Sequence, residues 1–185
     1  YNGSGFETIQ KAINEKKLDA KVVVVISNNT NAGVLEKAES FDIPNFIIND
    51  KRYPGQNIDD KCARLLKDFD CDYIFLSGFM KKIEDNMLKT FENKIINTHP
   101  AILPSIYGGA GMYGHFVHEA VVKNGEKKSG VTIHYVNENY DEGEKILIKE
   151  LFLDENETAE TLENRIKDLE KIAIVEAFKK VLEER

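Results

Sequence analysis

Asn97 and His99 stand two residues apart where a short apolar run, Ile95 and Ile96, gives way to Pro100. In an extended chain, residues at positions i and i+2 point to the same side, so the amide and the imidazole can face one atom. An amide N–H and a protonated imidazole are suitable donors to the oxyanion of a tetrahedral intermediate, and histidine also delivers a proton near neutral pH. The pair indicates acyl transfer, although a histidine beside a proline at a strand end is often structural.

A carboxylate that could support this pair is Asp141, in the turn Tyr140-Asp141-Glu142-Gly143. If Asp141 lies close to His99, it favours the imidazolium and raises the pKa of the ring. Aspartate before glycine is also ordinary turn chemistry, and the sequence alone leaves both interpretations open.

The segment Gly3-Ser4-Gly5 precedes a helical pattern. Small residues there let backbone N–H groups approach an anion, and a helix N-terminus favours negative charge, so a phosphate could bind. The motif is short and lacks the lysine of a Walker loop and the full dinucleotide fingerprint. His115, His118 and His134 lack the HExxH spacing of a zinc helix, and we expect no metal.

The elements that must position these residues alternate along the first half of the chain. Apolar residues at helical spacing alternate with short β-branched runs, which is typical of βαβ units. We therefore expect an α/β fold with a doubly wound, mostly parallel sheet. The predicted strands cover residues 21–26, 45–48, 73–77 and 94–97, and the predicted helices cover residues 6–13, 32–41, 59–69 and 84–91.

The second half of the chain does not continue this alternation of helices and strands. Residues 100–114 are rich in glycine and proline and are predicted to form an active-site loop before a helix over residues 115–123. Runs over residues 130–136 and 145–153 are expected to form a late antiparallel hairpin. A long amphipathic C-terminal helix is predicted over residues 158–184.

Composition limits the class of protein. A chain of 185 residues with 42% hydrophobic residues predicts one domain over residues 1–185. The formal net charge of −7 disfavours nucleic acid and anionic membrane, no apolar run is long enough to span a bilayer, and the two cysteines are too few for a disulfide framework. We expect a soluble cytoplasmic protein. Because the opening loop leads straight into a helix, we also expect a first strand upstream of Tyr1.

Three separated segments resemble motifs of the folate-dependent formyltransferases. Residues Asn97-Thr98-His99-Pro100 with the following Ala101-Ile102-Leu103-Pro104 resemble the Asn-x-His motif and its Leu-Leu-Pro. Residues Tyr140-Asp141-Glu142-Gly143 resemble Leu-Asp-x-Gly, and Ser77-Gly78-Phe79-Met80-Lys81 resembles Ala-Gly-Phe-Met-Arg. The resemblance covers essentially the whole chain and implies a Rossmann-like formyltransferase fold.

The resemblance also implies roles for individual residues. The family's catalytic residues fall on Asn97, His99 and Asp141. Its phosphate and ribonucleotide contacts fall on Gly3, Ser4, Gly5, Lys167 and Glu170. Its folate contacts fall on Met80, Lys81, Lys82, Ile83, Asn97, Asn137, Glu138, Asn139, Tyr140 and Asp141. Lys81 replaces a frequent arginine, which keeps the charge and loses the planar fork. Lys167 and Glu170 share a helix face, and a surface ion pair is the alternative interpretation.

The expected activity follows from the same resemblance. The formyl group of 10-formyltetrahydrofolate, the cosubstrate, would pass to the amine of glycinamide ribonucleotide in de novo purine biosynthesis, through a tetrahedral intermediate stabilised by Asn97 and His99 with support from Asp141. The expected partners are these small molecules, without nucleic acid or membrane. Three alternatives remain: a formyltetrahydrofolate hydrolase, an amino-sugar formyltransferase, and a non-catalytic nucleotide-binding module.

Overall fold

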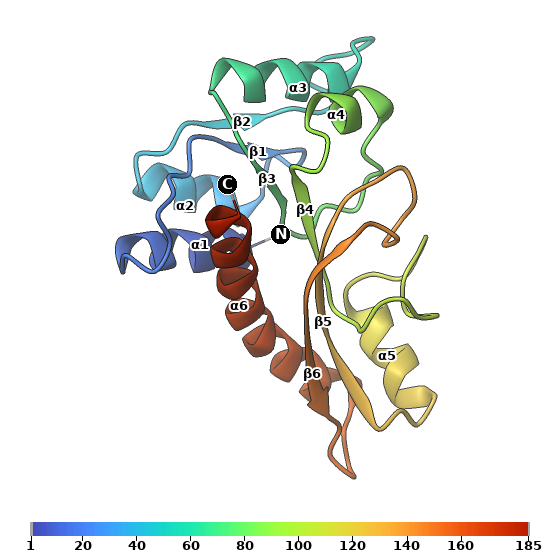
Figure 1. The fold of residues 1–185 in the computed structure, drawn as a ribbon. Helices are drawn as coiled ribbons and strands as arrows, with labels where there is room; N and C mark the ends of the chain where they lie inside the picture. The colour runs from blue at the N-terminus through green and yellow to red at the C-terminus, as the bar shows by residue number, and fades with distance from the viewer. Residues whose placement is uncertain (1, 185) are drawn as a thin grey trace.

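Helices and strands alternate along the chain in the computed structural model, which describes residues 2–184 (Figure 1). The helices are α1 (Ser4–Asn14), α2 (Gly33–Ser40), α3 (Ile58–Asp68), α4 (Asp85–Thr90), α5 (His115–Lys123) and α6 (Ala159–Glu183). The strands are β1 (Val25–Ser27), β2 (Asn45–Ile47), β3 (Ile74–Leu76), β4 (Ile95–His99), β5 (Lys128–Tyr135) and β6 (Lys145–Phe152). Each predicted element is present, and the predicted α/β class is confirmed.

The strands pair in two groups. β1 pairs in parallel with β2, while β3, β4, β5 and β6 form a second sheet in that order. In the second sheet β3 and β4 are parallel, and β5 joins β4 and β6 in antiparallel pairs. The late antiparallel hairpin is confirmed, and so is the parallel pairing of the strands before it, β1 with β2 and β3 with β4. The expected strand upstream of Tyr1 lies outside the described residues and stays a prediction.

The long C-terminal helix α6 begins at a reciprocal cap. The Thr158 side chain accepts the backbone N–H of Thr161, and the Thr161 hydroxyl accepts the backbone N–H of Thr158. This exchange satisfies two backbone donors at the helix start. From there α6 runs beside β5 and β6 and also packs against α1 and α5 (Figure 1).

Burial of one apolar face of α6 builds the main core. The buried side chains of this cluster come from α1, β4, α5, β5, β6 and α6, so the core fixes β4 relative to both α1 and α6. Its fully enclosed members include Ile96, Val117, Val131, Ile133, Leu162, Ile166 and Ile174. None of the helices described between residues 2 and 184 is both long and apolar enough to cross a membrane.

The turn between β5 and β6 folds back against β5. A Cβ atom on Gly143 would lie 1.7 Å from the carbonyl oxygen of Tyr135, so only glycine permits this approach. The residue two positions earlier, Asp141, has a positive φ of 60°, a conformation that aspartate tolerates better than most residues. The fold-back carries Asp141 toward the end of β4.

Candidate active site

Asn97 faces the neighbouring strand β5, where its Cα is paired with that of His134. The Asn97 Nδ2 atom lies 3.2 Å from His134 Nε2, and His134 Nδ1 lies 2.8 Å from the carbonyl oxygen of Tyr135. Because a carbonyl only accepts, Nδ1 carries a proton, and in this tautomer Nε2 has the lone pair that accepts one amide N–H of Asn97. Within residues 2–184 the second amide N–H of Asn97 has no acceptor, so it is available to a ligand.

His99 is held by the loop that follows β4. The ring is only 4% exposed; its Nε2–H donates to the carbonyl oxygen of Tyr107 at 2.6 Å, and its Nδ1 lies 3.5 Å from Asp141 Oδ2. Burial lowers the pKa of His99, and this outweighs the opposing effects of Asp141 and of the Tyr107 carbonyl. The prediction of a raised pKa is therefore wrong in its net direction, although Asp141 acts as expected.

Asp141 lies between the two rings. One carboxylate oxygen is 3.5 Å from His134 Nε2, and the other accepts the backbone N–H of Gly109 at 2.8 Å. Burial acts to raise the pKa of Asp141, but the interactions with His134, His99 and the Gly109 N–H together lower it. Asp141 is thus an ionised carboxylate that accepts the Gly109 N–H and lies 3.5 Å from a nitrogen of each imidazole ring. Asn97, His99, His134 and Asp141 form one group, called the β4–β5 cluster below.

The loop segment 107–109 closes over this cluster. The Tyr107 hydroxyl donates to Glu126 Oε1 at 2.6 Å and accepts the side-chain amide of Asn124 at 3.0 Å, which anchors the loop beyond the end of α5. A Cβ atom on Gly108 would lie 2.6 Å from Leu103 Cδ2 and 3.4 Å from the Asp141 Cβ atom, so the chain at Gly108 passes close to both side chains. The predicted loop therefore supplies backbone groups to the cluster.

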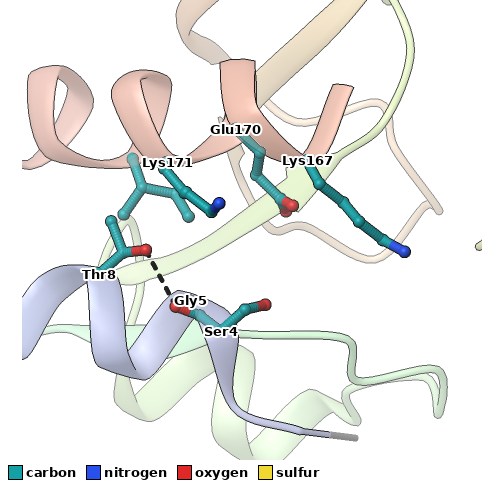
Figure 2. A pocket seen from close by; sticks show the side chains of 7 residues that line it. Ser4, Gly5, Thr8, Lys167, Glu170 and Lys171 are labelled. Carbon is teal, nitrogen blue, oxygen red and sulfur yellow. Dashed lines mark hydrogen bonds between the residues drawn. The ribbon is translucent and has the colours of Figure 1, made fainter. Parts of the chain in front are cut away.

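A second site lies between the N-terminus of α1 and the face of α6, in a cavity of about 170 Å³ (Figure 2). Of the predicted phosphate and ribonucleotide residues, it brings together Ser4, Gly5, Lys167 and Glu170. Gly3 does not line the cavity; it is the N-cap of α1, with a positive φ of 70°. The full lining, called the α1–α6 pocket below, is Ser4, Gly5, Thr8, Lys167, Glu170, Lys171 and Ile174.

Charges in this pocket come from α6, and backbone dipoles come from α1. Lys167 pairs with Glu163 at 2.6 Å and Lys171 with Asp168 at 2.8 Å, so Lys167 does not form the surface ion pair with Glu170 that was the alternative interpretation. Glu170 instead accepts the hydroxyl of Thr98 at 3.0 Å. Together with the free N–H groups of the first turn of α1, the lysines make the pocket suitable for an anion.

The first predicted folate segment follows β3. Lys81 is exposed and contacts Asp50 Oδ2 at 3.1 Å. Lys82 and Met80 are also exposed, whereas the side chain of Ile83 is buried in a cluster with Ala63. Its apolar side chain is more stable in that core than at the surface. The folate contact predicted for Ile83 stays a prediction.

The second predicted folate segment lies in the turn after β5. Asn137 Oδ1 accepts the backbone N–H of Asn139 at 3.0 Å, which shapes the turn, while Glu138 and Tyr140 are exposed. Val136, directly before this segment, packs in the same apolar cluster as Ile83. The two predicted folate segments therefore adjoin the same apolar cluster.

Sequence reasoning missed several residues of the two sites. His134 was considered only as a metal ligand, and among residues 2–184 no group of three metal-binding side chains is found. Its position in β5, opposite Asn97, was a usable signal once the hairpin register was known. The roles of the Tyr107 carbonyl, Thr98 and Lys171 had no signal in the sequence, because each depends on a contact with a distant segment.

Comparison with known proteins settles the family. The sequence model described as formyl transferase matches residues 1–178. The chain belongs to the formyl transferase family. Among its relatives, phosphoribosylglycinamide formyltransferase of Bacillus subtilis is 35% identical over 91% of this chain and 84% of its own length. The chloroplastic phosphoribosylglycinamide formyltransferase of Arabidopsis thaliana is 34% identical over 99% of this chain, which spans only 63% of that relative.

A solved structure agrees with the fold of this formyl transferase chain. The crystal structure of phosphoribosylglycinamide formyltransferase from Bacillus halodurans superposes with a TM-score of 0.89 at 27% identity, and the match covers 98% of this chain and 91% of that one. The similarity therefore extends over both the β4–β5 cluster and the α1–α6 pocket.

Proposed function

We propose that this formyl transferase moves the formyl group of 10-formyltetrahydrofolate to the primary amine of glycinamide ribonucleotide. The relatives named for this acceptor support the assignment. In this reaction the folate supplies an activated formyl group, and the chain binds both substrates, orients them and manages the proton and the developing negative charge.

One observation carries the proposal: two chemically different sites meet at the end of β4. Asn97 and His99 face the β4–β5 cluster, while Thr98 between them contacts Glu170 of the α1–α6 pocket. A cluster suited to acyl transfer therefore lies next to a pocket suited to an anion. This arrangement fits an acceptor with a phosphate at one end and an amine at the other.

Asn97 and His99 are assigned to the oxyanion of the tetrahedral intermediate. The free N–H of Asn97 is one donor, and its orientation is fixed because the other N–H is held by His134. The Nε2–H of His99 is the second donor, and it exchanges the Tyr107 carbonyl for the substrate oxygen. Both donors are partly or fully buried, where such hydrogen bonds are stronger than in water.

Asp141 is assigned to proton transfer. It is ionised and lies within 3.5 Å of both imidazole rings, so it can accept the proton that the amine loses as the new C–N bond forms. The same proton then passes to the folate nitrogen as the C–N bond between the formyl carbon and the folate breaks. The exposed segments around Lys81 and Tyr140 are assigned to the folate.

The test is an assay of folate product from 10-formyltetrahydrofolate with and without glycinamide ribonucleotide. Turnover that depends on this acceptor is expected. Release of formate without an acceptor would identify a hydrolase, and turnover only with a phosphorylated amino sugar would identify the other transferase. Ligand binding without turnover would leave a nucleotide-binding module. Each of these three results would overturn the proposal.

A further inference from the structure

Thr98 lies between the two proposed catalytic residues but faces the other way. Side chains alternate along a strand, so Asn97 and His99 point to one face of β4 and Thr98 points to the opposite one. There its hydroxyl donates to Glu170 Oε1 at 3.0 Å. The bond joins the catalytic strand to the α1–α6 pocket across 72 positions of sequence.

Glu170 is the unusual charge of this pocket. Figure 2 shows its carboxylate projecting from α6 toward α1, in the same cavity as Lys167 and Lys171. Burial raises the pKa of Glu170, and the Thr98 hydroxyl is the strongest opposing influence, followed by Lys167 and then Lys171. A donor to the ionised form stabilises that form, so Thr98 helps to keep Glu170 charged.

The other elements around the pocket add little charge that acts on Glu170. α1 contributes the neutral side chains Ser4 and Thr8, and its Glu7 is tied to Lys37 at 2.5 Å. β4 contributes only the neutral Thr98. The ionisation of Glu170 is therefore governed by burial, by two lysines of its own helix and by one threonine hydroxyl.

An ionised Glu170 divides the pocket into two parts. A carboxylate repels phosphate, so we expect an anionic group to bind at the α1 N-terminus and the lysines, away from Glu170. Among the described residues no donor reaches Glu170 Oε2, which is free to accept hydroxyl groups of a ligand. Neutral vicinal hydroxyls, such as those of a pentose, are suitable donors for this oxygen.

We propose that Thr98 is a positioning residue that holds Glu170 as an oriented, ionised acceptor for the pentose hydroxyls of the phosphorylated acceptor. This inference rests on the proposed function. It adds a residue on the catalytic strand whose effect is on acceptor binding rather than on the chemical step.

The test compares Thr98→Val, which keeps the shape and loses the hydroxyl, with Thr98→Ser, which keeps the hydroxyl. The dissociation constant for glycinamide ribonucleotide is measured by calorimetry, and kcat and KM are measured by the acceptor-dependent assay. For Thr98→Val we expect binding and KM to weaken by about tenfold, as for loss of one hydrogen bond to a charged group, with kcat nearly unchanged. Thr98→Ser should restore binding, and Thr90→Val on α4 is the matched control.

The pH dependence separates positioning from general destabilisation. In the wild type, binding weakens as pH falls through the raised pKa of Glu170, because protonation removes the acceptor. Thr98→Val loses the donor to the ionised form, so the weakening should begin at a higher pH. Glu170→Gln should remove this dependence, and Thr98→Val should add no further loss in that background.

Two results would overturn the role of Thr98. The first is a Thr98→Val protein that binds the ribonucleotide like the wild type at every pH. The second is a Thr98→Val substitution that weakens ribonucleotide binding by the same factor in the wild-type and in the Glu170→Gln background. A wild-type protein that neither binds nor formylates glycinamide ribonucleotide would overturn the proposed function, and this inference with it.

Discussion

The β4–β5 cluster and the α1–α6 pocket differ in how their polar groups are held. In the cluster, His99 and His134 are 4% and 2% exposed. Three of their four ring nitrogens lie near a partner from another segment, and the fourth, His134 Nδ1, lies near the carbonyl oxygen of the adjacent Tyr135. In the pocket, the lysine side chains are 57% and 55% exposed, and each forms an ion pair with a neighbour on its own helix. The cluster is preorganised, whereas the pocket presents charges that a ligand can rearrange. Changes in the cluster should therefore affect kcat, and changes in the pocket should affect KM.

The largest effect is expected for Asp141→Asn. The change keeps the shape of the side chain, which asparagine also tolerates at positive φ, and removes the charge that accepts a proton. We expect kcat to fall by about 100- to 10,000-fold with little change in the KM for the ribonucleotide. Asp42→Asn, at another aspartate with positive φ (54°), is the matched control. If Asp141→Asn keeps more than about a tenth of the wild-type kcat, Asp141 is not the group that accepts the proton.

A somewhat smaller effect is expected for Asn97→Ala. Loss of one oxyanion donor typically costs about 100- to 1,000-fold in kcat, and the remaining cluster should still bind substrates. Asn45→Ala on β2 is the control, because that amide donates to the nearby Ile43 carbonyl and lies outside the β4–β5 cluster. His99→Ala should match Asn97→Ala. In the double variant, the fold-losses in kcat of the two single variants multiply if Asn97 and His99 act independently. A smaller loss in kcat would show that both residues serve one oxyanion site.

The smallest effect is expected in the pocket, for Lys167→Met. Because this lysine is largely exposed and already paired with Glu163, we expect the KM for the ribonucleotide to rise by only about tenfold, with kcat unchanged. The difference from wild type should shrink at high salt, since exposed charges are screened. Lys179→Met, on the same helix, is the control. If Lys167→Met lowers kcat and leaves KM unchanged, the assignment of KM effects to the pocket and kcat effects to the cluster is wrong.

Much of the fold could be predicted because its signals are local. The helix His115–Lys123 has its predicted bounds, and the strand predicted over residues 94–97 is present as Ile95–His99, because both follow from side-chain patterns over a few residues. The signals that determine which strands pair are less local. The split between β1–β2 and the second sheet, and the antiparallel pairing of β5 with β4, depend on which strands meet in space.

The site divides in the same way. Motif residues Asn97, His99 and Asp141 were found from the sequence, and the structure brings them together. The motif could not give the direction of the pKa of His99, because desolvation of the ring depends on packing from distant segments and exceeds the pull of Asp141.

By itself, the sequence determined the order of helices and strands and the identity of the chemically capable residues, since both are properties of short stretches of chain. Tertiary structure alone decided that His134 orients Asn97, that the Tyr107 carbonyl holds His99, and that Thr98 reaches Glu170. Each of those contacts needs atoms a few ångströms apart from segments separated along the chain, and only the packing of the sheet against its helices fixes such distances.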